Sequence, residues 1–337
     1  MNIKQSTRLV DIARMTNLSV CTVSLALRNS PLVKPKTKER ITQLAERLNY
    51  RPSEAARSLV LNKTRMVGIV SHNLASSYYN QIAHDIQNQL KIHGYLGIVI
   101  TADSREEQAS AVNTFSHRKV DGIIATRLPP ELIMDLKNEN IPLVIYDVAP
   151  AVPADYVVPD LNKGGYMLTE HLIKLGYREI GFIGHMGDDR RFNGFKAALH
   201  DNLIPFHREW IMPGIDKYRG GYEAMQNLLR LTERPRAVVC FNDVSAIGAM
   251  RALADAGLKV PDDMAVVGFD NIEEGAYAAA RLTTIDQQSE EMARKAVELF
   301  LQKLDRPQED APANIVIGVK LVVRESCGWK KTKGPTP

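Results

Sequence analysis

The sequence lacks the features of several protein classes. Its three cysteines (Cys21, Cys240 and Cys327) are far apart and form no CxxC pair, which argues against a disulfide framework or a zinc knuckle and favours a reducing cytoplasm. Aromatic residues make up only 6% of the chain, which disfavours an aromatic-rich β-sandwich. No uncharged apolar run reaches about 18 residues, and the first residues contain no apolar signal core, so we expect neither a membrane helix nor secretion.

Short catalytic signatures are also missing. The sequence contains no GxGxxG, GxxxxGK[ST], HExxH or GxSxG motif, and its eight histidines are scattered without metal-ligand spacing. We therefore expect a protein that is not an enzyme and that holds neither a metal nor a cofactor.

Basic residues are concentrated near the N-terminus. Residues 1–65 contain thirteen Lys or Arg and four Asp or Glu, a net charge of +9, whereas the remaining 272 residues contain 30 basic and 35 acidic side chains. A small basic module on a mildly acidic body is typical of a nucleic-acid-binding head attached to another domain, although a solvated basic face gives the same pattern.

The first 50 residues predict a three-helix head. Apolar residues at helical spacing indicate helices over Leu9–Thr16, from Ser19 onward and over Pro35–Leu48. Asn17 fits the positive-φ position that a tight turn between the first two helices needs, and Ser19 is a good N-cap. Residues 51–63 predict a linker with one very short helix over Ser53–Val60, which is too short to be stable unless another surface packs on it.

From Met66 onward, strands and helices alternate in two series of about 100 residues each, which predicts parallel sheets with helices on both faces. We expect a body over residues 64–337 with two lobes. The first covers about 64–161 and 289–321, and the second about 162–288 and 322–330. Ligands of such folds bind at the carboxyl ends of the strands, so a cleft between the lobes is the expected site.

Specific motifs extend this pattern along the whole chain. The head reads LVDIARMTNLSVCTVSLALRN, followed by NYRP and AARSL, and the body contains DGII, HLIKLGYREIGFIG, RFNGF, FNDVSAIGAM, VPDDMAVVGFDN, LTTI and VVRES. In this order they resemble the lactose-repressor/galactose-repressor family of bacterial transcription regulators. The resemblance implies a helix–turn–helix head, a hinge helix and a two-lobe α/β body like that of periplasmic binding proteins.

For the head, the resemblance implies that the helix beginning near Ser19 enters the major groove of DNA. Val20, Cys21 and Leu25 take the positions that face base edges. The family commonly has Arg at the position of Leu25, so apolar contact with thymine methyls replaces guanine readout there. Phosphate contacts are expected from Thr22, Ser24, Asn49 and Tyr50.

The segment Ser53–Val60 resembles the family's hinge helix, which pairs with its dimer mate in the minor groove. Leu59 is placed to insert into a base step, and Ala56 is small enough for close approach. In the alternative interpretation, Leu59 is a linker residue that packs on the body.

The resemblance also implies an effector site between the lobes, formed by Tyr78, Tyr79, Asp147, Arg191, Asn242 and Asp270. Carboxylates accept hydroxyl hydrogens, and Arg and Asn donate to oxygens, which suits a sugar or sugar derivative. Strand-end capping is the alternative role for Asp147 and Asn242. Many relatives carry an aromatic ring near Asp216; here the nearest is Tyr218, so stacking on the effector is either transferred to Tyr218 or lost.

Together these features predict a cytoplasmic, homodimeric transcription regulator, a repressor rather than an activator, of carbohydrate-related genes. It would bind a pseudo-palindromic operator and one small effector. A soluble sugar-binding receptor would use the same body but not the basic head, and a single-strand binder would need interleaved aromatics that the head lacks.

Overall fold

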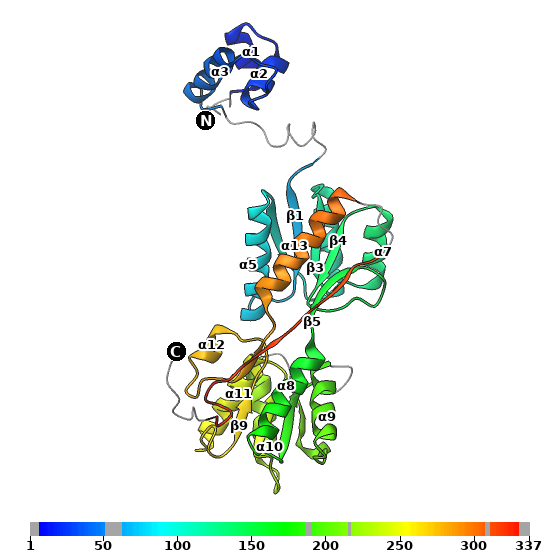
Figure 1. Ribbon diagram of the computed structural model, residues 1–337, viewed down its shortest axis with the longest axis vertical. Coiled ribbons are helices and arrows are strands. Elements are labelled where there is room, and N and C mark those ends of the chain that lie inside the picture. The colour runs from blue at the N-terminus through cyan, green and yellow to red at the C-terminus, as the bar shows by residue number, and fades with distance from the viewer. Residues whose placement is uncertain (1–6, 51–62, 186–189, 215–216, 307–310, 330–337) are drawn as a thin grey trace. The chain divides into compact units, whose positions relative to one another are not determined.

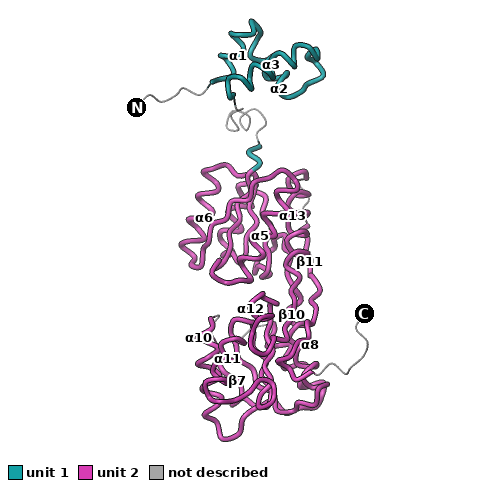
Figure 2. Tube along the Cα trace, turned by 90° about the vertical axis from the view of Figure 1, so that its left-hand side faces the viewer, with its two compact units in different colours: residues 1–65 teal, residues 66–337 magenta. Residues whose placement is uncertain are grey.

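The structure, a computed structural model, describes residues 7–50, 63–185, 190–214, 217–306 and 311–329. The chain forms two compact units, residues 1–65 and 66–337, which are coloured separately in Figure 2.

The described part of the first unit contains three helices (Figure 1): α1 (Leu9–Thr16), α2 (Val20–Leu27) and α3 (Pro35–Arg47). One apolar face of each helix contributes to a common core: Ile12, Ala13, Val23, Ala26, Val33, Ile41 and Ala45. Asn17 takes the predicted left-handed conformation (φ 55°), and α1 and α2 are bent by 106° relative to each other, the geometry of a helix–turn–helix. Of the described helices, no single one is long and apolar enough to cross a membrane, although α1 and α2 taken together pass that test.

The second unit contains two α/β lobes. The first lobe is built on a six-stranded sheet in the order β11-β5-β4-β3-β1-β2, whose paired strands are parallel. Helices α5 and α13 pack on one face, and α6 and α7 on the other, each over its own apolar cluster. The elements are β1 (Met66–Ser71), α5 (Ser77–Ile92), β2 (Leu96–Thr101), α6 (Arg105–His117), β3 (Gly122–Thr126), α7 (Pro130–Asn138), β4 (Leu143–Tyr146), β5 (Asp155–Pro159), α13 (Ser289–Asp305) and β11 (Asn314–Ile317).

The second lobe is built on a four-stranded parallel sheet in the order β7-β6-β8-β9, with α8 and α9 over one face and α10 and α11 over the other. A separate antiparallel pair, β10 and β12, completes it. The elements are α8 (Leu161–Lys174), β6 (Ile180–Gly184), α9 (Arg190–Asp201), a 3-10 turn (Arg208–Trp210), β7 (Ile211–Pro213), α10 (Tyr218–Leu229), β8 (Ala237–Cys240), α11 (Asp243–Asp255), β9 (Ala265–Val267), α12 (Glu273–Ala276), β10 (Thr284–Asp286) and β12 (Lys320–Val322).

The chain passes between the lobes three times: from β5 to α8, from β10 to α13 and from β11 to β12. The last crossing lies at Gly318, because β12 pairs with β10 from Lys320 onward. Residues 320 and 321, which the sequence placed in the first lobe, are therefore strand residues of the second.

Three strands were not expected from the sequence. The strand β5 joins β4 to β11 inside the first sheet, and β7 and β10 are three-residue strands. The strands β7 and β10 are too short for a period-2 pattern to appear, whereas β5 (DYVVP) does not alternate and ends in Pro159, a residue that disfavours a central strand. Pairing with neighbours from elsewhere in the chain defines them.

Close helix packing in the second lobe fixes the start of α9. A Cβ atom on Gly165 of α8 would lie 2.1 Å from the carbonyl oxygen of Arg191, and a Cβ on Gly194 of α9 would lie 2.0 Å from that of Asn162. Only glycine permits this mutual approach. The backbone that carries Arg191 is therefore held directly against α8.

Candidate functional site

The predicted effector residues lie where strands end or a helix begins. Asp147 follows β4 of the first lobe, whereas Asn242 and Asp270 follow β8 and β9 of the second, and Arg191 is in the first turn of α9. Tyr78 and Tyr79 are in the first turn of α5. The carboxyl ends of parallel strands are the usual place for a ligand in such folds.

Hydrogen bonds join the first-lobe residues around Asp147. The Tyr78 hydroxyl donates to Oδ1 of Asp147 at 2.8 Å, and the Tyr79 hydroxyl donates to Oδ2 at 3.1 Å. Tyr78 also lies 3.3 Å from Oε1 of Gln287, in the segment between β10 and α13. The site in this lobe is thus a carboxylate held by two phenol groups and linked to the crossing segment.

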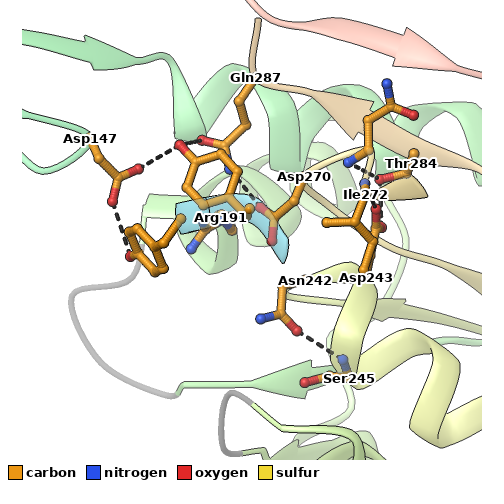
Figure 3. Close-up of polar contacts among 12 residues, drawn as sticks. Asp147, Arg191, Asn242, Asp243, Ser245, Asp270, Ile272, Thr284 and Gln287 are labelled. Carbon is orange, nitrogen blue, oxygen red and sulfur yellow. Dashed lines mark hydrogen bonds and ion pairs between the residues drawn. The ribbon is translucent and has the colours of Figure 1, made fainter. Parts of the chain in front are cut away.

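The same network continues into the second lobe (Figure 3). Nε2 of Gln287 donates to Oδ1 of Asp270 at 2.5 Å, and Nη2 of Arg191 lies 3.9 Å from that oxygen. The Arg191 guanidinium lies 4.7 Å from the centre of the Phe269 ring. A single chain of polar contacts therefore runs from Tyr79 across both lobes to Arg191.

The two phenol groups act as donors. Burial, and then the carboxylates of Asp147 and Asp270, raise the pKa of Tyr78 well above its usual value. Burial and Asp147 also raise the pKa of Tyr79, against the opposing effect of Arg191 and Arg127. Both hydroxyls therefore stay protonated near neutral pH and remain hydrogen-bond donors to Asp147.

Asn242 caps a helix, whereas the alternative role considered from the sequence was capping of a strand end. Its Oδ1 accepts the backbone N–H of Ser245 at 2.9 Å, so it is the N-cap of α11. Figure 3 shows its amide nitrogen turned away from Ser245. Any contact of Asn242 with a ligand therefore depends on that nitrogen.

Unusual backbone conformations occur at these positions. Asp147 has φ 68°, Asp270 has φ 112° and Asn271 has φ 56°. Residues other than glycine adopt this region at a cost of about 1–3 kcal/mol, and such residues are found mainly where function requires them.

Two residues of this region were not anticipated. Gln287 connects the lobes, and Asp243, which is completely buried, accepts hydrogen bonds from Thr284 and from the backbone of Ile272. The signal for Gln287 was its place two residues after the LTTI motif. The signal for Asp243 was an acid directly after Asn242.

A cavity of about 980 Å³ adjoins Tyr78 and Asp270. Among its lining side chains there is one amine, Lys320, and seven carboxylates: Asp85, Asp270, Glu273, Glu274, Asp286, Glu290 and Glu291. The lining of this cavity, which includes two of the predicted effector residues, is therefore strongly acidic. In the described part of the chain, no group of three or more His, Cys, Asp or Glu side chains could hold a metal ion.

In the head, α2 presents the predicted DNA-reading residues. Ser19 caps this helix by accepting the N–H of Thr22 at 3.0 Å. Val20 and Cys21 are exposed, whereas Leu25 is only partly exposed because it also packs against the head core. Val20 and Cys21 are therefore the more accessible pair for contact with bases.

The remaining head residues differ in setting. Ser24 accepts a hydrogen bond from Arg28 at 2.8 Å, and Thr22 is partly exposed beside Ser19. Asn49, with φ 47°, is exposed after α3, and Tyr50 packs partly on the head core. Ala56 and Leu59, assigned to the hinge helix, lie outside the described residues.

Comparison with known proteins agrees with both units. Residues 8–53 match the model of bacterial regulatory proteins of the lacI family, and residues 169–327 match a periplasmic binding protein-like domain. The HTH-type transcriptional repressor PurR of Actinobacillus pleuropneumoniae serotype 3 (strain JL03) is 33% identical over 94% of this chain and 97% of its own. PurR of Haemophilus influenzae (strain PittEE) is 31% identical with the same coverage.

Solved structures show the same architecture. The lac repressor dimer bound to operator and the anti-inducer ONPF is 25% identical, with a TM-score of 0.86 over 96% of this chain and 99% of that one. The complex of the regulator CelR with cellobiose is 27% identical, with a TM-score of 0.72 over 95% and 99%. A regulator of Enterococcus faecium with bound ribose is 26% identical, with a TM-score of 0.71 over 77% and 98%.

The chain belongs to the lacI family of bacterial regulatory proteins, with a helix–turn–helix head and a two-lobe periplasmic-binding-protein-like body. Within that family it is a DNA-binding transcriptional repressor.

Proposed function

We propose that this repressor binds a pseudo-palindromic operator as a homodimer and that a neutral, polyhydroxylated effector of the sugar class, bound between the lobes, controls it. The observation that supports the proposal is the polar chain from Tyr79 through Asp147, Tyr78, Gln287 and Asp270 to Arg191. It joins hydrogen-bond donors and acceptors of both lobes in one network. Sugar hydroxyls both donate and accept, and they match such a mixed set.

The acidic cavity beside the site supports an uncharged effector over a phosphorylated one. Seven carboxylates and one amine line the adjoining cavity, and a field of one sign repels ligands of the same sign. Rings near the site already contact protein groups, since Arg191 lies over Phe269 and Tyr79 makes T-shaped contacts with His72 and Tyr78. This arrangement supports a ligand held by hydrogen bonds rather than a flat base held by stacking.

The effector would act through the angle between the lobes. Ser77 of the first lobe donates a hydrogen bond to Glu274 of the second, and Val244 and Ile272 of the second lobe pack in the first-lobe core with Tyr78. A ligand that prefers one lobe angle shifts the population toward it in proportion to its differential affinity. In our proposal this changes how two hinge segments, containing Ala56 and Leu59, pair on DNA.

On the DNA side, we propose that Val20, Cys21 and Leu25 contact bases and that Ser19, Thr22, Ser24, Asn49 and Tyr50 contact the backbone. The charge of +9 in residues 1–65 supports this, because phosphate contacts dominate affinity. Selection of bound duplexes from a random pool tests it: an inverted repeat with about one or two helical turns between half-site centres is expected, and a motif without inverted symmetry contradicts the dimer.

Calorimetry on the full-length protein tests the effector class. Ribose, galactose, glucose and cellobiose are compared with ribose 5-phosphate and glucose 6-phosphate, and with adenine, guanine and adenosine, each at up to about 10 mM. We expect a neutral sugar to bind and to change operator affinity. Binding only of a phosphorylated sugar, only of a base or nucleoside, or of none of these compounds contradicts the proposal.

A further inference from the structure

The loop after β9, residues 268–272, carries Asp270 in an unfavourable backbone conformation. Asp270 and Asn271 are consecutive non-glycine residues with positive φ, at 112° and 56°. Such a pair persists only when the surrounding structure holds it in place. The contacts that hold this loop therefore determine where the Asp270 carboxylate lies.

Asp243 makes the central contacts to this loop. Its Oδ2 accepts the backbone N–H of Ile272 at 2.9 Å, and its Oδ1 accepts the hydroxyl of Thr284 at 2.6 Å (Figure 3). The backbone N–H of Asp243 donates to the carbonyl of Phe269 at 2.7 Å. The side chain is fully buried, so these bonds are not exchanged with water.

Neighbouring residues reinforce the same loop. The N–H of Asn271 lies 3.3 Å from the Thr284 hydroxyl, and Arg324 donates to the Asn271 side chain at 2.7 Å. Gly268 leaves room for the carboxylate, since a Cβ there would lie 2.1 Å from Oδ1 of Asp243. Asp243 also follows Asn242 directly. The start of α11 therefore carries one predicted effector residue, Asn242, and contacts the loop that carries another, Asp270.

We propose that Asp243 is a positioning residue of the effector site: its carboxylate, bonded to Ile272 and Thr284, holds the Asp270–Asn271 backbone in its binding conformation and so sets effector affinity. Asp243 does not itself contact the effector. The link to affinity rests on the function proposed above, whereas the link to loop conformation does not.

The ionisation of Asp243 supplies a specific signature. Burial raises the pKa of this carboxyl to about 7, although the hydrogen bonds from Thr284 and Ile272 and the guanidinium of Arg324 act in the opposite direction. The charge of Asp243 also adds to burial in raising the pKa of the nearby buried Cys240 thiol. The carboxyl is therefore ionised above about pH 7 and neutral below it.

This pKa gives opposite trends for affinity and stability. Because the folded pKa exceeds the unfolded value of about 3.9, ionisation destabilises the folded state, and the contribution of Asp243 to stability falls as pH rises toward about 7. Hydrogen bonds to an ionised acceptor are stronger, so the loop is held better and effector affinity rises as the folded carboxyl ionises around pH 7. A residue with only a structural role would not give opposite pH trends for effector affinity and stability.

Two substitutions distinguish positioning from folding. In Asp243→Asn the amide can still accept from Ile272 and donate to the Thr284 oxygen, but it cannot ionise. In Asp243→Ala both partners become buried without an acceptor. Asp255→Asn, at the exposed far end of α11 where Asp255 pairs with Arg251, is the matched control.

The first measurement is amide hydrogen exchange of residues 268–274 in the full-length protein without effector. We expect faster exchange in Asp243→Ala and wild-type exchange in Asp255→Asn. Wild-type exchange in Asp243→Ala would overturn the positioning role whether or not any sugar binds.

The second measurement is calorimetry at about pH 6 and about pH 8, with whichever of ribose, galactose, glucose and cellobiose binds wild type most tightly. We expect wild type to bind roughly 3- to 10-fold more tightly at the higher pH, Asp243→Asn to lose that dependence, and Asp243→Ala to bind roughly 10- to 100-fold more weakly. If Asp270→Ala abolishes binding while both Asp243 variants bind like wild type, the inference is wrong and the proposed function stands. If wild type binds none of the four sugars, the proposed function fails, and the exchange measurement alone decides whether Asp243 positions the loop.

Discussion

Replacing Asp270 with alanine tests the effector site most directly. Its side chain is 7% exposed and bridges Gln287, at 2.5 Å, and Arg191, at 3.9 Å. Hydrogen bonds to charged groups contribute about 1.5–3 kcal/mol each, so loss of the carboxylate should weaken effector binding by roughly 10- to 100-fold. Calorimetry on the full-length protein measures this loss directly.

Operator binding should be unchanged in the same variant, because Asp270 belongs to the body unit and the helix–turn–helix to the other. Asp270→Gly is the matched variant: it also lacks the carboxylate, but glycine adopts φ 112° without strain. It should therefore lose as much effector affinity as Asp270→Ala. Its free energy of unfolding should be about 1 kcal/mol higher than that of Asp270→Ala.

A double-mutant cycle with Arg191→Ala completes the test. The two groups share one site, so their effects on effector affinity should be non-additive by about 0.5–3 kcal/mol. Wild-type effector affinity in Asp270→Ala, or full additivity of the pair, would refute the reasoning that both residues bind the same ligand.

Three further substitutions examine other parts of the chain. Leu59→Ala should weaken binding to the selected operator by a few kcal/mol and leave binding to random DNA nearly unchanged; equal losses in the two titrations would exclude an inserted wedge. Asn17→Ala should destabilise the head by about 1 kcal/mol, whereas Asn17→Gly should be close to neutral, because φ is 55° at this position. Chemical denaturation followed by a probe of the head measures both effects. A larger loss of stability for glycine than for alanine would contradict the turn geometry. Gly165→Ala should displace the start of α9, because its Cβ would lie 2.1 Å from the Arg191 carbonyl oxygen. We expect a loss of about 1–3 kcal/mol in stability together with weaker effector binding. A variant that matches wild type in both stability and effector affinity would contradict the packing argument.

The sequence by itself determined the fold class and most of the elements. Apolar positions at helical spacing and the turn residue Asn17 identified the three helices of the head, and the alternation of strands and helices identified the parallel sheets. These signals are local: a period of 3.6 or a buried apolar run is visible within one segment. The family resemblance, not a local pattern, selected Asp147, Asn242 and Asp270, which follow β4, β8 and β9 in the structure.

The tertiary structure decided which of these residues work together. Gln287 and Asp243 became visible only when distant segments met, since their partners lie 17 to 209 residues away in the chain. It also showed that Asn242 caps a helix and that β5 is a strand because β4 and β11 pair with it on either side. Such contacts depend on pairing and burial between segments far apart in sequence, and no local pattern of residues encodes them.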